Sequence, residues 1–156
     1  MFGFLKRKAR EIKSPVDGHV IALESVDDEV FSQKMAGDGV AIIPVSNIFT
    51  APIDGVVSKI FSTNHAFSVK STKDLEVMVH IGLDTVTLEG KGFERLVNEG
   101  DEVKAGDGII RVDLAYIGEH AKDIVTPIII SDESDVRNIE KRYSIVKSQD
   151  IIMEVN

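Results

Sequence analysis

The chain has 156 residues, of which 43% are hydrophobic and 28% charged, and this composition is typical of one globular domain with a sizeable core. It contains no cysteine, which excludes disulfides, thiolate metal sites and a cysteine nucleophile. No run approaches the roughly 18 apolar residues of a membrane span, and the net charge of −8 argues against nucleic-acid binding, because phosphate contacts need clustered Lys and Arg.

The first 13 residues differ in charge from the rest of the chain. They hold five basic residues and Glu11, a local charge of +4, whereas the rest holds 13 basic and 25 acidic residues. Phe2, Phe4 and Leu5 precede the basic cluster, the reverse of the order in a secretory signal. Two interpretations stay open: a flexible tail, or a weak anchor on anionic lipid. We therefore expect an arm at residues 1–13 and a single domain at residues 14–156.

Short β-branched runs between Gly, Pro and Asp residues predict an all-β fold, an antiparallel β-sandwich or flattened barrel with a few short helices. In chain order, the predicted strands are Gly18–Leu23, Gly39–Val45, Gly55–Ile60, Glu76–Ile81, Gly108–Val112, Pro127–Ser131 and Ile151–Val155. We also expect a brief turn at Asp28–Met35, a helix at Leu114–Lys122, and a turn or short solvated helix at Asp132–Lys141.

Two short motifs each occur twice. SPVDG at residues 14–18 matches APIDG at residues 51–55, an offset of 37, and AGDG occurs at residues 36–39 and 105–108. In each motif the Asp-Gly pair supplies a turn whose Gly tolerates positive φ before a strand begins. We interpret the repeats as scaffold: two related hairpin units packed about one core, a duplicated barrel-sandwich hybrid.

Two of the four histidines stand in informative surroundings. His65 and His80 lie in or beside strand-like runs and are 15 positions apart, so they can occupy adjacent strands. An imidazole titrates near neutrality and can be a base, a metal ligand or a nucleophile. Taken alone, each is more often a hydrogen-bonded core residue than a catalyst. His19, after an Asp-Gly turn, and His120, in the predicted helix, are expected at the surface.

The segments around these histidines resemble glucose-type enzyme IIA, the phosphocarrier family of the bacterial phosphoenolpyruvate-dependent sugar phosphotransferase system. TNHAF at residues 63–67 and HIGLDTV at residues 80–86 carry the resemblance most specifically. Further segments that resemble the family are IKSPVDG (12–18), EVF (29–31), MAGDGVAI (35–42), APIDG (51–55), KGF (91–93), GDG (106–108) and TPI (126–128). The resemblance thus spans most of the chain.

The resemblance implies that His80 is the phosphorylated nucleophile and His65 its partner, and the chemistry agrees. A neutral imidazole nitrogen can attack phosphorus, and the transferring group spreads negative charge over three oxygens that neighbouring donors must stabilise. His65 can supply one N–H, and the Thr63 hydroxyl can hold the opposite nitrogen of His65. Backbone N–H groups at residues 83–86 can complete the cradle, and no cofactor is required.

Apolar side chains near the histidines are candidates for a partner-binding rim: Phe31, Phe61, Phe67, Met78 and Ile81. Their alternative role is core packing. The resemblance places Phe31, Phe61 and Met78 where the family has exposed aromatics, and Met78 stands in place of the usual Phe; its thioether suits an adaptable interface. Asp84 either caps the turn after the strand or faces the site and guides basic partners.

The resemblance implies the carrier HPr as phosphoryl donor and an enzyme IIB cysteine, free or within a IICB permease, as acceptor. It also implies a cytoplasmic location, with the arm at the membrane surface as an open alternative, and further regulatory partners. Because two histidines make half of a tetrahedral zinc site, a zinc ion shared with a partner through His65 and His80 is a secondary expectation. The competing functions are a zinc hydrolase of related fold, which the lack of a His-x-His pair disfavours, and a non-catalytic regulatory module.

Overall fold

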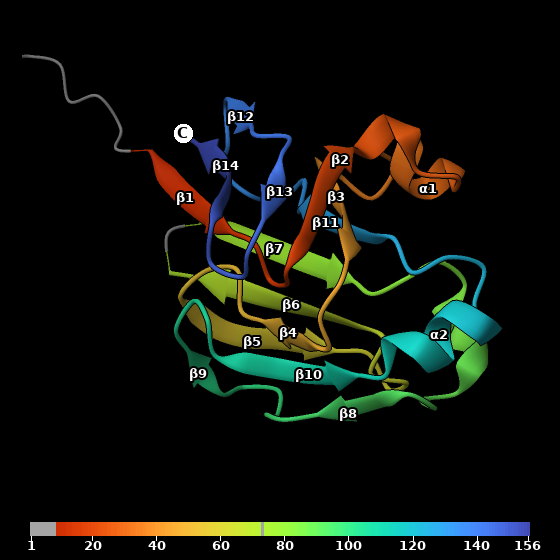
Figure 1. Ribbon diagram of the computed structural model, residues 1–156. Helices are drawn as coiled ribbons and strands as arrows, with labels where there is room; N and C mark the ends of the chain where they lie inside the picture. Colours follow the sequence, from red (N-terminus) through yellow and green to blue (C-terminus); the bar gives the residue numbers. More distant parts are fainter. Residues whose placement is uncertain (1–8, 73) are drawn as a thin grey trace, which may run out of the picture.

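The computed structural model describes residues 9–72 and 74–156 as packed antiparallel sheets with short helical segments at their margins (Figure 1). The main sheet has eight strands in the order β13-β2-β3-β11-β7-β6-β5-β9. In chain order these are β2 Gly18–Ala22, β3 Asp38–Pro44, β5 Gly55–Ile60, β6 Ala66–Ser71, β7 Leu75–His80, β9 Glu102–Val103, β11 Thr126–Ile130 and β13 Ile145–Val146.

Two three-stranded sheets complete the described β structure. One has the order β1-β14-β12, with β1 Arg10–Lys13, β12 Ile139–Lys141 and β14 Ile151–Val155. The other has the order β4-β10-β8, with β4 Ile48–Thr50, β8 Phe93–Arg95 and β10 Gly108–Val112. The helical segments are η1 Leu23–Ser25, α1 Glu29–Ser32, η2 Thr85–Leu88 and α2 Leu114–His120. Within the described part of the chain, none of the helices has the length and apolar character that crossing a membrane requires.

The all-β prediction is confirmed. The seven predicted strands correspond to β2, β3, β5, β7, β10, β11 and β14, and the predicted helix corresponds to α2, with ends that differ by at most two residues. The turn expected near Asp28 becomes the single-turn helix α1, which begins there because the Asp28 carboxylate accepts the Val30 N–H at 2.9 Å.

Two predicted boundaries are wrong. Residues 10–13, assigned to the arm, form β1 and pair with β14, because Ile12 is fully buried in the core and ties this segment to the domain. The segment Asp132–Lys141, predicted to be a turn or a short solvated helix, does begin with a turn, but the prediction is wrong at its end, where β12 pairs with β14. Residues 1–8 of the predicted arm lie outside the described residues.

The repeated segments lie against each other. The Lys13 N–H donates to the Pro52 carbonyl at 2.9 Å, and the Thr50 N–H donates to the Pro15 carbonyl at 2.8 Å. The offset of 37 relates both donors and both acceptors, so the two copies of the first repeat meet about a local two-fold axis. The strand that follows each copy of the first repeat has corresponding neighbours: β2 pairs with β13 and β3, and β5 pairs with β9 and β6. The strands of the second repeat differ, because β3 pairs with β2 and β11 in the main sheet, whereas β10 pairs with β4 and β8.

The main sheet buries side chains on both of its faces. Its inner face contributes to the main core together with the two smaller sheets. On the outer face, η1 and α1 cover part of the sheet and form a second cluster: Leu23, Val26, Phe31, Ala41, Leu83, Val125 and Ile129. This second cluster matters for function, because it fixes Phe31 and the helix that carries it.

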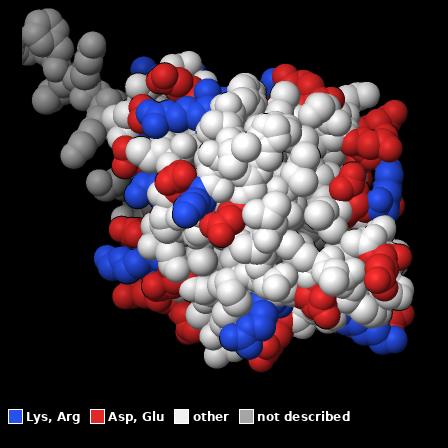
Figure 2. All heavy atoms as spheres, in the orientation of Figure 1, with Lys and Arg blue, Asp and Glu red and all other residues white. Residues whose placement is uncertain are grey.

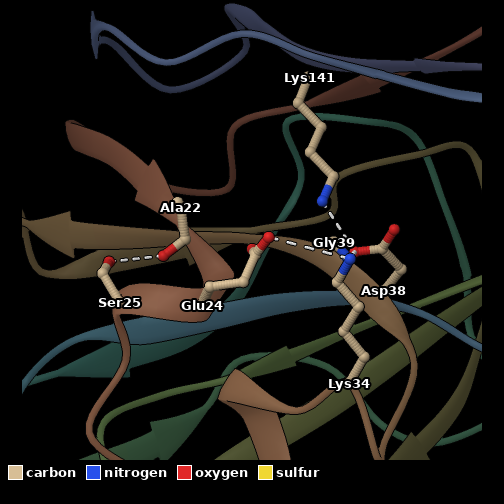
Figure 3. Close-up of polar contacts among 7 residues, drawn as sticks. All are labelled: Ala22, Glu24, Ser25, Lys34, Asp38, Gly39 and Lys141. Carbon is tan, nitrogen blue, oxygen red and sulfur yellow. Dashed lines mark hydrogen bonds and ion pairs between the residues drawn. The ribbon is translucent and has the colours of Figure 1, made fainter.

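A charged network links the C-terminal strands to α1 (Figure 3). Lys141 on β12 lies 2.8 Å from the Asp38 carboxylate at the start of β3, and Lys34, just after α1, lies 3.6 Å from the same oxygen. Lys34 also lies 3.9 Å from Glu24. The chain between α1 and β3 is therefore held at both of its ends by ion pairs.

Candidate functional site

Strands β6 and β7 place the two central histidines side by side. Their antiparallel register pairs Ala66 with His80, and the Ile81 N–H donates to the His65 carbonyl at 2.8 Å. The centroids of the His65 and His80 rings are 5.1 Å apart, with an angle of 78° between the ring planes. The proximity predicted from the spacing of the two motifs is therefore confirmed.

The orientation of His80 is set by the alternation of β7 and by the turn after it. Val77 and Val79 point into the core, whereas His80 lies on the opposite face and is half-buried. The Nδ1 atom of His80 lies 2.8 Å from the Gly82 carbonyl oxygen. A carbonyl can only accept, so Nδ1 carries the proton and the neutral ring has its lone pair on Nε2.

The turn that presents this carbonyl requires glycine. Gly82 has φ of +77°, and a Cβ atom there would lie 2.6 Å from the Thr85 Cγ2 atom and 2.9 Å from the Asp123 carbonyl oxygen. Both approaches are closer than real Cβ contacts allow, and the Asp123 carbonyl is backbone that cannot easily move. The HIG sequence at residues 80–82 therefore encodes both the reactive ring and the acceptor for its Nδ1–H.

His65 is held by the turn between β5 and β6. It is 4% exposed, and its Nδ1 atom lies 2.5 Å from the Thr63 hydroxyl oxygen, as the sequence predicted. Asn64 adopts a left-handed conformation with φ of +61°, and its Oδ1 atom accepts a hydrogen bond from Arg95 Nε at 2.8 Å. Arg95, which sequence reasoning missed, thus supports the turn that delivers His65.

Aromatic rings flank the two imidazoles on both sides. The Phe31 ring lies 5.0 Å from the His80 ring, and the Phe61 ring lies 5.2 Å from the His65 ring. The Lys59 ammonium lies 4.8 Å from the centroid of Phe61. The four rings form one continuous row, in which each histidine packs against the other and against a phenylalanine.

The surroundings keep both histidines neutral at pH 7. Burial, followed by the charge of a protonated His80, lowers the pKa of His65 to about 4. Burial also lowers the pKa of His80 from its usual value, while the Gly82 carbonyl and the carboxylates of Asp28 and Asp84 oppose that change. Neutral imidazoles retain the lone pair that a nucleophile needs.

The predicted rim is correct only in part. Phe61 and Met78 are half-buried, and Phe31 is largely buried but contacts His80. The rim prediction is wrong for Ile81 and Phe67, which are fully buried in the main core. For Ile81 the reason is that it follows an outward-facing histidine and so points to the opposite side. The predicted rim did not include three exposed apolar residues on α1, on the turn after it and on η2: Val30, Met35 and Val86.

Two carboxylates lie near His80, and the sequence indicated only one of them. Asp84 is exposed and left-handed, with φ of +56°, and its side chain makes no capping hydrogen bond to η2. Asp84 thus occupies the N-cap position of η2, where its backbone carbonyl accepts from the Thr87 hydroxyl at 2.7 Å, but its carboxylate takes no part in the cap. Asp28, 52 positions before His80 in the chain, also raises the pKa of that histidine. Only its position at the start of a predicted turn marked Asp28 in the sequence.

The predicted donors at residues 83–86 need one correction. The Leu83 N–H is not available to a ligand, because it donates to the Asp123 carbonyl at 2.9 Å. His19 and His120 are exposed, as predicted, and both are on other strands or helices than the central pair.

The residues fit only half of a zinc site. Zinc in proteins takes four ligands in a tetrahedral arrangement, and the two imidazoles supply two nitrogens. Among residues 9–72 and 74–156, no group of three or more His, Cys, Asp or Glu side chains can hold a metal ion. The described part of the chain therefore lacks the ligand set of a zinc hydrolase.

Comparisons with known proteins agree with this geometry. Residues 10–136 match the family described as phosphoenolpyruvate-dependent sugar phosphotransferase system, EIIA 1. The chain is 42% identical over 156 residues to the glucose-specific EIIA component of Haemophilus influenzae, covering 98% of this chain and 94% of that protein. It is 44% identical over 140 residues to the corresponding component of Borreliella burgdorferi, covering 90% of this chain and 74% of that protein.

A solved structure shows the same fold. Glucose permease IIA from Mycoplasma capricolum superposes with a TM-score of 0.92 at 39% sequence identity, and the match covers 99% of each chain. Family match, identity and fold agree over nearly the whole length. The chain belongs to the EIIA 1 family of the phosphoenolpyruvate-dependent sugar phosphotransferase system and is a phosphocarrier of that system.

Proposed function

We propose that His80 Nε2 accepts a phosphoryl group from the phosphohistidine of HPr and passes it to a cysteine of enzyme IIB during glucose-type sugar uptake. The observation that carries the assignment is the hydrogen bond from His80 Nδ1 to the Gly82 carbonyl, which leaves the lone pair on Nε2. The identities of donor, acceptor and sugar rest on the family and on the names of the relatives.

The proposed transfer breaks one P–N bond and forms another. The Nε2 lone pair of His80 attacks phosphorus, and the electrons of the broken bond return to the leaving imidazole of HPr. Positive charge develops on the His80 ring as Nε2 bonds to phosphorus, and the Gly82 carbonyl stabilises that charge through the Nδ1–H. In the second half-reaction, a IIB thiolate attacks phosphorus and His80 leaves as a neutral imidazole.

His65 is the donor that serves the phosphoryl oxygens in this proposal. When the Thr63 hydroxyl donates to His65 Nδ1, the proton of the neutral ring resides on Nε2, where it can bond to a phosphoryl oxygen. The low pKa of His65 keeps the ring neutral, so it supplies a hydrogen bond without a full positive charge. A neutral donor holds phosphate loosely enough for release to the acceptor.

Charge and apolar surface around the histidines suit a basic partner. Asp28 and Asp84 lie on the His80 side, and the chain carries a net charge of −8. Opposite charges on a partner speed diffusional encounter and orient it. Phe31, Phe61 and Met78 supply apolar contacts, and we propose that HPr and IIB use this same surface in turn. We place the carrier in the cytoplasm, where these partners operate.

Intact mass after incubation with phosphoenolpyruvate, enzyme I and HPr tests the proposal. The protein should gain one acid-labile phosphoryl group, and His80→Gln should abolish the gain, because an amide nitrogen is not a nucleophile. His65→Gln should still accept phosphate but transfer it slowly to IIB. His120→Gln is the matched control, because His120 is exposed on α2 and should be dispensable. Acid-labile phosphate on the folded His80→Gln variant would refute the assignment.

A further inference from the structure

The turn between β5 and β6, residues 61–65, presents His65 and is shaped by bonds of its own. The Asn64 N–H donates to the Phe61 carbonyl at 2.7 Å, and the Thr63 hydroxyl bonds to His65 Nδ1. Two further hydrogen bonds reach this turn and the end of β5 from the segment that joins β8 to β9, 31 and 39 positions later in the chain. The position of His65 therefore depends on a distant part of the molecule.

Arg95 on β8 makes the first of these contacts. Its Nε atom donates to Asn64 Oδ1 at 2.8 Å. Asn64 has a φ of +61°, a left-handed conformation that asparagine tolerates better than most residues do. Because Asn64 immediately precedes His65, holding its side chain restricts the backbone from which the imidazole projects.

Glu99 makes the second contact, at the edge of β5. The Phe61 N–H points to β6, where the Ala66 carbonyl accepts it at 2.9 Å, so the Ile60 N–H points to the opposite edge. On that edge β9 pairs with the first two residues of β5. Farther along, the Glu99 carboxylate accepts the Ile60 N–H at 2.8 Å. This contact fixes the point at which β5 ends and the turn begins.

The segment that carries both side chains is itself fixed to the sheets. Strand β8 pairs with β10. Beyond β8, the Asn98 N–H donates to the Asp101 carboxylate at 2.9 Å, and the Asp101 N–H donates to the Asn98 carbonyl at 3.2 Å, which closes a turn. The Asp101 carbonyl accepts the Val57 N–H at 2.9 Å and ties this second turn to β5. The two side chains therefore hold residues 61–65 from an anchored base.

The contact of Arg95 differs from that of an ordinary surface arginine. Figure 2 shows basic and acidic side chains together along the lower edge of the molecule, where β8 and β10 lie. On these strands Arg111 pairs with the Glu94 carboxylate at 3.0 Å, and the two side chains are 57% and 63% exposed. Such exposed pairs contribute little to stability. Arg95 is exposed as well, but its Nε atom bonds to a neutral amide within the turn that carries His65.

We propose that Arg95 and Glu99 are positioning residues for phosphoryl transfer, which direct the Nε2–H of His65 at the phosphoryl group on His80. The inference rests on the proposed function, because that function gives His65 its role as a donor. A hydrogen bond weakens steeply when donor and acceptor are misaligned, so a neutral donor serves the reaction only from a fixed turn. Arg95 holds one end of that turn and Glu99 holds the other.

The rates of the two half-reactions test the inference. Arg95→Met should slow transfer to IIB about tenfold, the effect of losing one hydrogen bond, and should change acceptance from HPr much less. The same division is expected of His65→Gln. Arg111→Met is the matched control, because it removes the same charge from a neighbouring strand of the same sheet and its partner is Glu94. Both of its rates should equal those of the parent.

Glu99 and Asn64 give two further comparisons. Glu99→Gln keeps an oxygen acceptor for the Ile60 N–H and should transfer phosphate to IIB faster than Glu99→Ala, which removes the acceptor. Asn64→Gly keeps the positive φ but removes the acceptor for Arg95. Arg95→Met should therefore slow transfer in the parent and have no further effect when it is added to Asn64→Gly.

Nitrogen NMR shifts of the His65 ring give a test that needs no phosphoryl transfer. In the parent they should report one neutral tautomer with its proton on Nε2. In Arg95→Met they should move toward a mixture of the two tautomers, whereas Arg111→Met should match the parent. A parent protein that gains no phosphate would refute the proposed function, and the ring shifts would still decide whether Arg95 positions His65.

Four outcomes would overturn the role of Arg95 and Glu99. They are unchanged His65 ring shifts in Arg95→Met, equal slowing of both half-reactions by Arg95→Met, equal transfer rates for Glu99→Gln and Glu99→Ala, and additive effects of Arg95→Met and Asn64→Gly.

Discussion

The ring of His65 lies 5.1 Å from the ring of His80, and the pairing of β6 with β7 sets this distance. The two rings differ in their hydrogen-bond partners: a hydroxyl for His65 and a backbone carbonyl for His80. This asymmetry separates a donor from a nucleophile, although both side chains are imidazoles.

The stability of the protein should fall as the pH falls below neutrality, and His65 should account for part of this loss. Its folded pKa of about 4 is lower than the usual histidine value of 6.5, so the unfolded chain binds the proton more readily. The loss of stability that His65 causes is absent above pH 6.5. It grows as the pH falls toward 4, with a limiting slope of about 1.4 kcal/mol per pH unit. Urea denaturation at several pH values measures it.

His65→Gln should remove this part of the pH dependence. Other groups also titrate in the acid range, so the informative quantity is the difference in the free energy of unfolding between the parent and the variant at each pH. That difference should shift in favour of the variant as the pH falls from 6.5. Parallel curves for the two proteins would contradict burial of a neutral His65.

Gly82→Ala should impair both the fold and phosphoryl acceptance. The added Cβ would lie 2.6 Å from Thr85 Cγ2 at a φ of +77°, and we expect a loss of roughly 1–3 kcal/mol of stability from backbone strain. Turning the peptide would remove the acceptor for His80 Nδ1–H, so the rate of phosphorylation by HPr should fall more than stability alone explains. Thermal denaturation and the phosphorylation rate measure the two effects.

Gly100→Ala is the control for that experiment. Gly100 has a similar φ of +90°, but nothing lies within 4 Å of its added Cβ. It should therefore lose stability through backbone strain and retain the parent rate of phosphorylation. If both alanine variants slow phosphorylation equally, the Gly82 carbonyl has no specific role.

Asp28→Asn should slow phosphoryl transfer from HPr in two ways. Removing the carboxylate weakens attraction to a basic partner, which lowers the association rate at low salt. It also lowers the pKa of His80 further, because Asp28 is one of the groups that raise it. Stopped-flow transfer at low and high salt separates the first effect, and NMR titration of the His80 ring reports the second. Asp132→Asn, at an exposed position between β11 and β12, is the control.

Lys141→Met should destabilise the protein at neutral pH by about 1 kcal/mol. Burial tends to raise the pKa of Asp38, but the hydrogen bonds from Lys141 and Gly39 and the charges of Lys141 and Lys34 lower it overall. A lowered carboxyl pKa adds stability above the unfolded pKa, and this stability is lost as the pH falls through the folded pKa. The cost of the substitution should shrink at acid pH.

Lys122→Met tests whether partial burial is the reason why loss of the Lys141 ion pair costs stability. The Lys122–Asp27 pair has side chains 42% and 92% exposed, against 15% and 33% for Lys141 and Asp38. Solvent screens the exposed pair, so its loss should change the free energy of unfolding little. Equal costs in urea denaturation would show that the network around Asp38 has no special strength.

Deletion of residues 1–8 tests the membrane-surface interpretation of the arm. The truncation keeps β1, which begins at Arg10. It should spare phosphorylation by HPr and reduce sedimentation with anionic vesicles, because it removes Phe2, Phe4 and Leu5 together with three basic residues. High salt should release the full-length protein from the vesicles. Equal sedimentation of both proteins at low salt would identify the arm as a tail.

Local sequence determined much of the fold and the identity of the central residues. Alternating apolar residues and Asp-Gly turns indicated β2, β3, β5 and β7, because strand period and turn chemistry depend on neighbours in the chain. The same holds for the HIG and TNH segments, in which a histidine and the group that orients it are two positions apart. Thr63 was found in this way.

Tertiary structure decided which distant residues joined the site and which neighbours left it. Asp28 approaches His80 only because α1 folds over the outer face of the main sheet. Arg95, which contacts Asn64, belongs to β8 in the β4-β10-β8 sheet. Ile81 lies beside His80 in sequence yet is buried in the main core, because His80 faces outward and the next side chain points to the opposite side. Residues 10–13 form a strand because β14, more than 130 positions later, supplies their partner. Such pairings depend on contacts between distant segments, which no local pattern specifies.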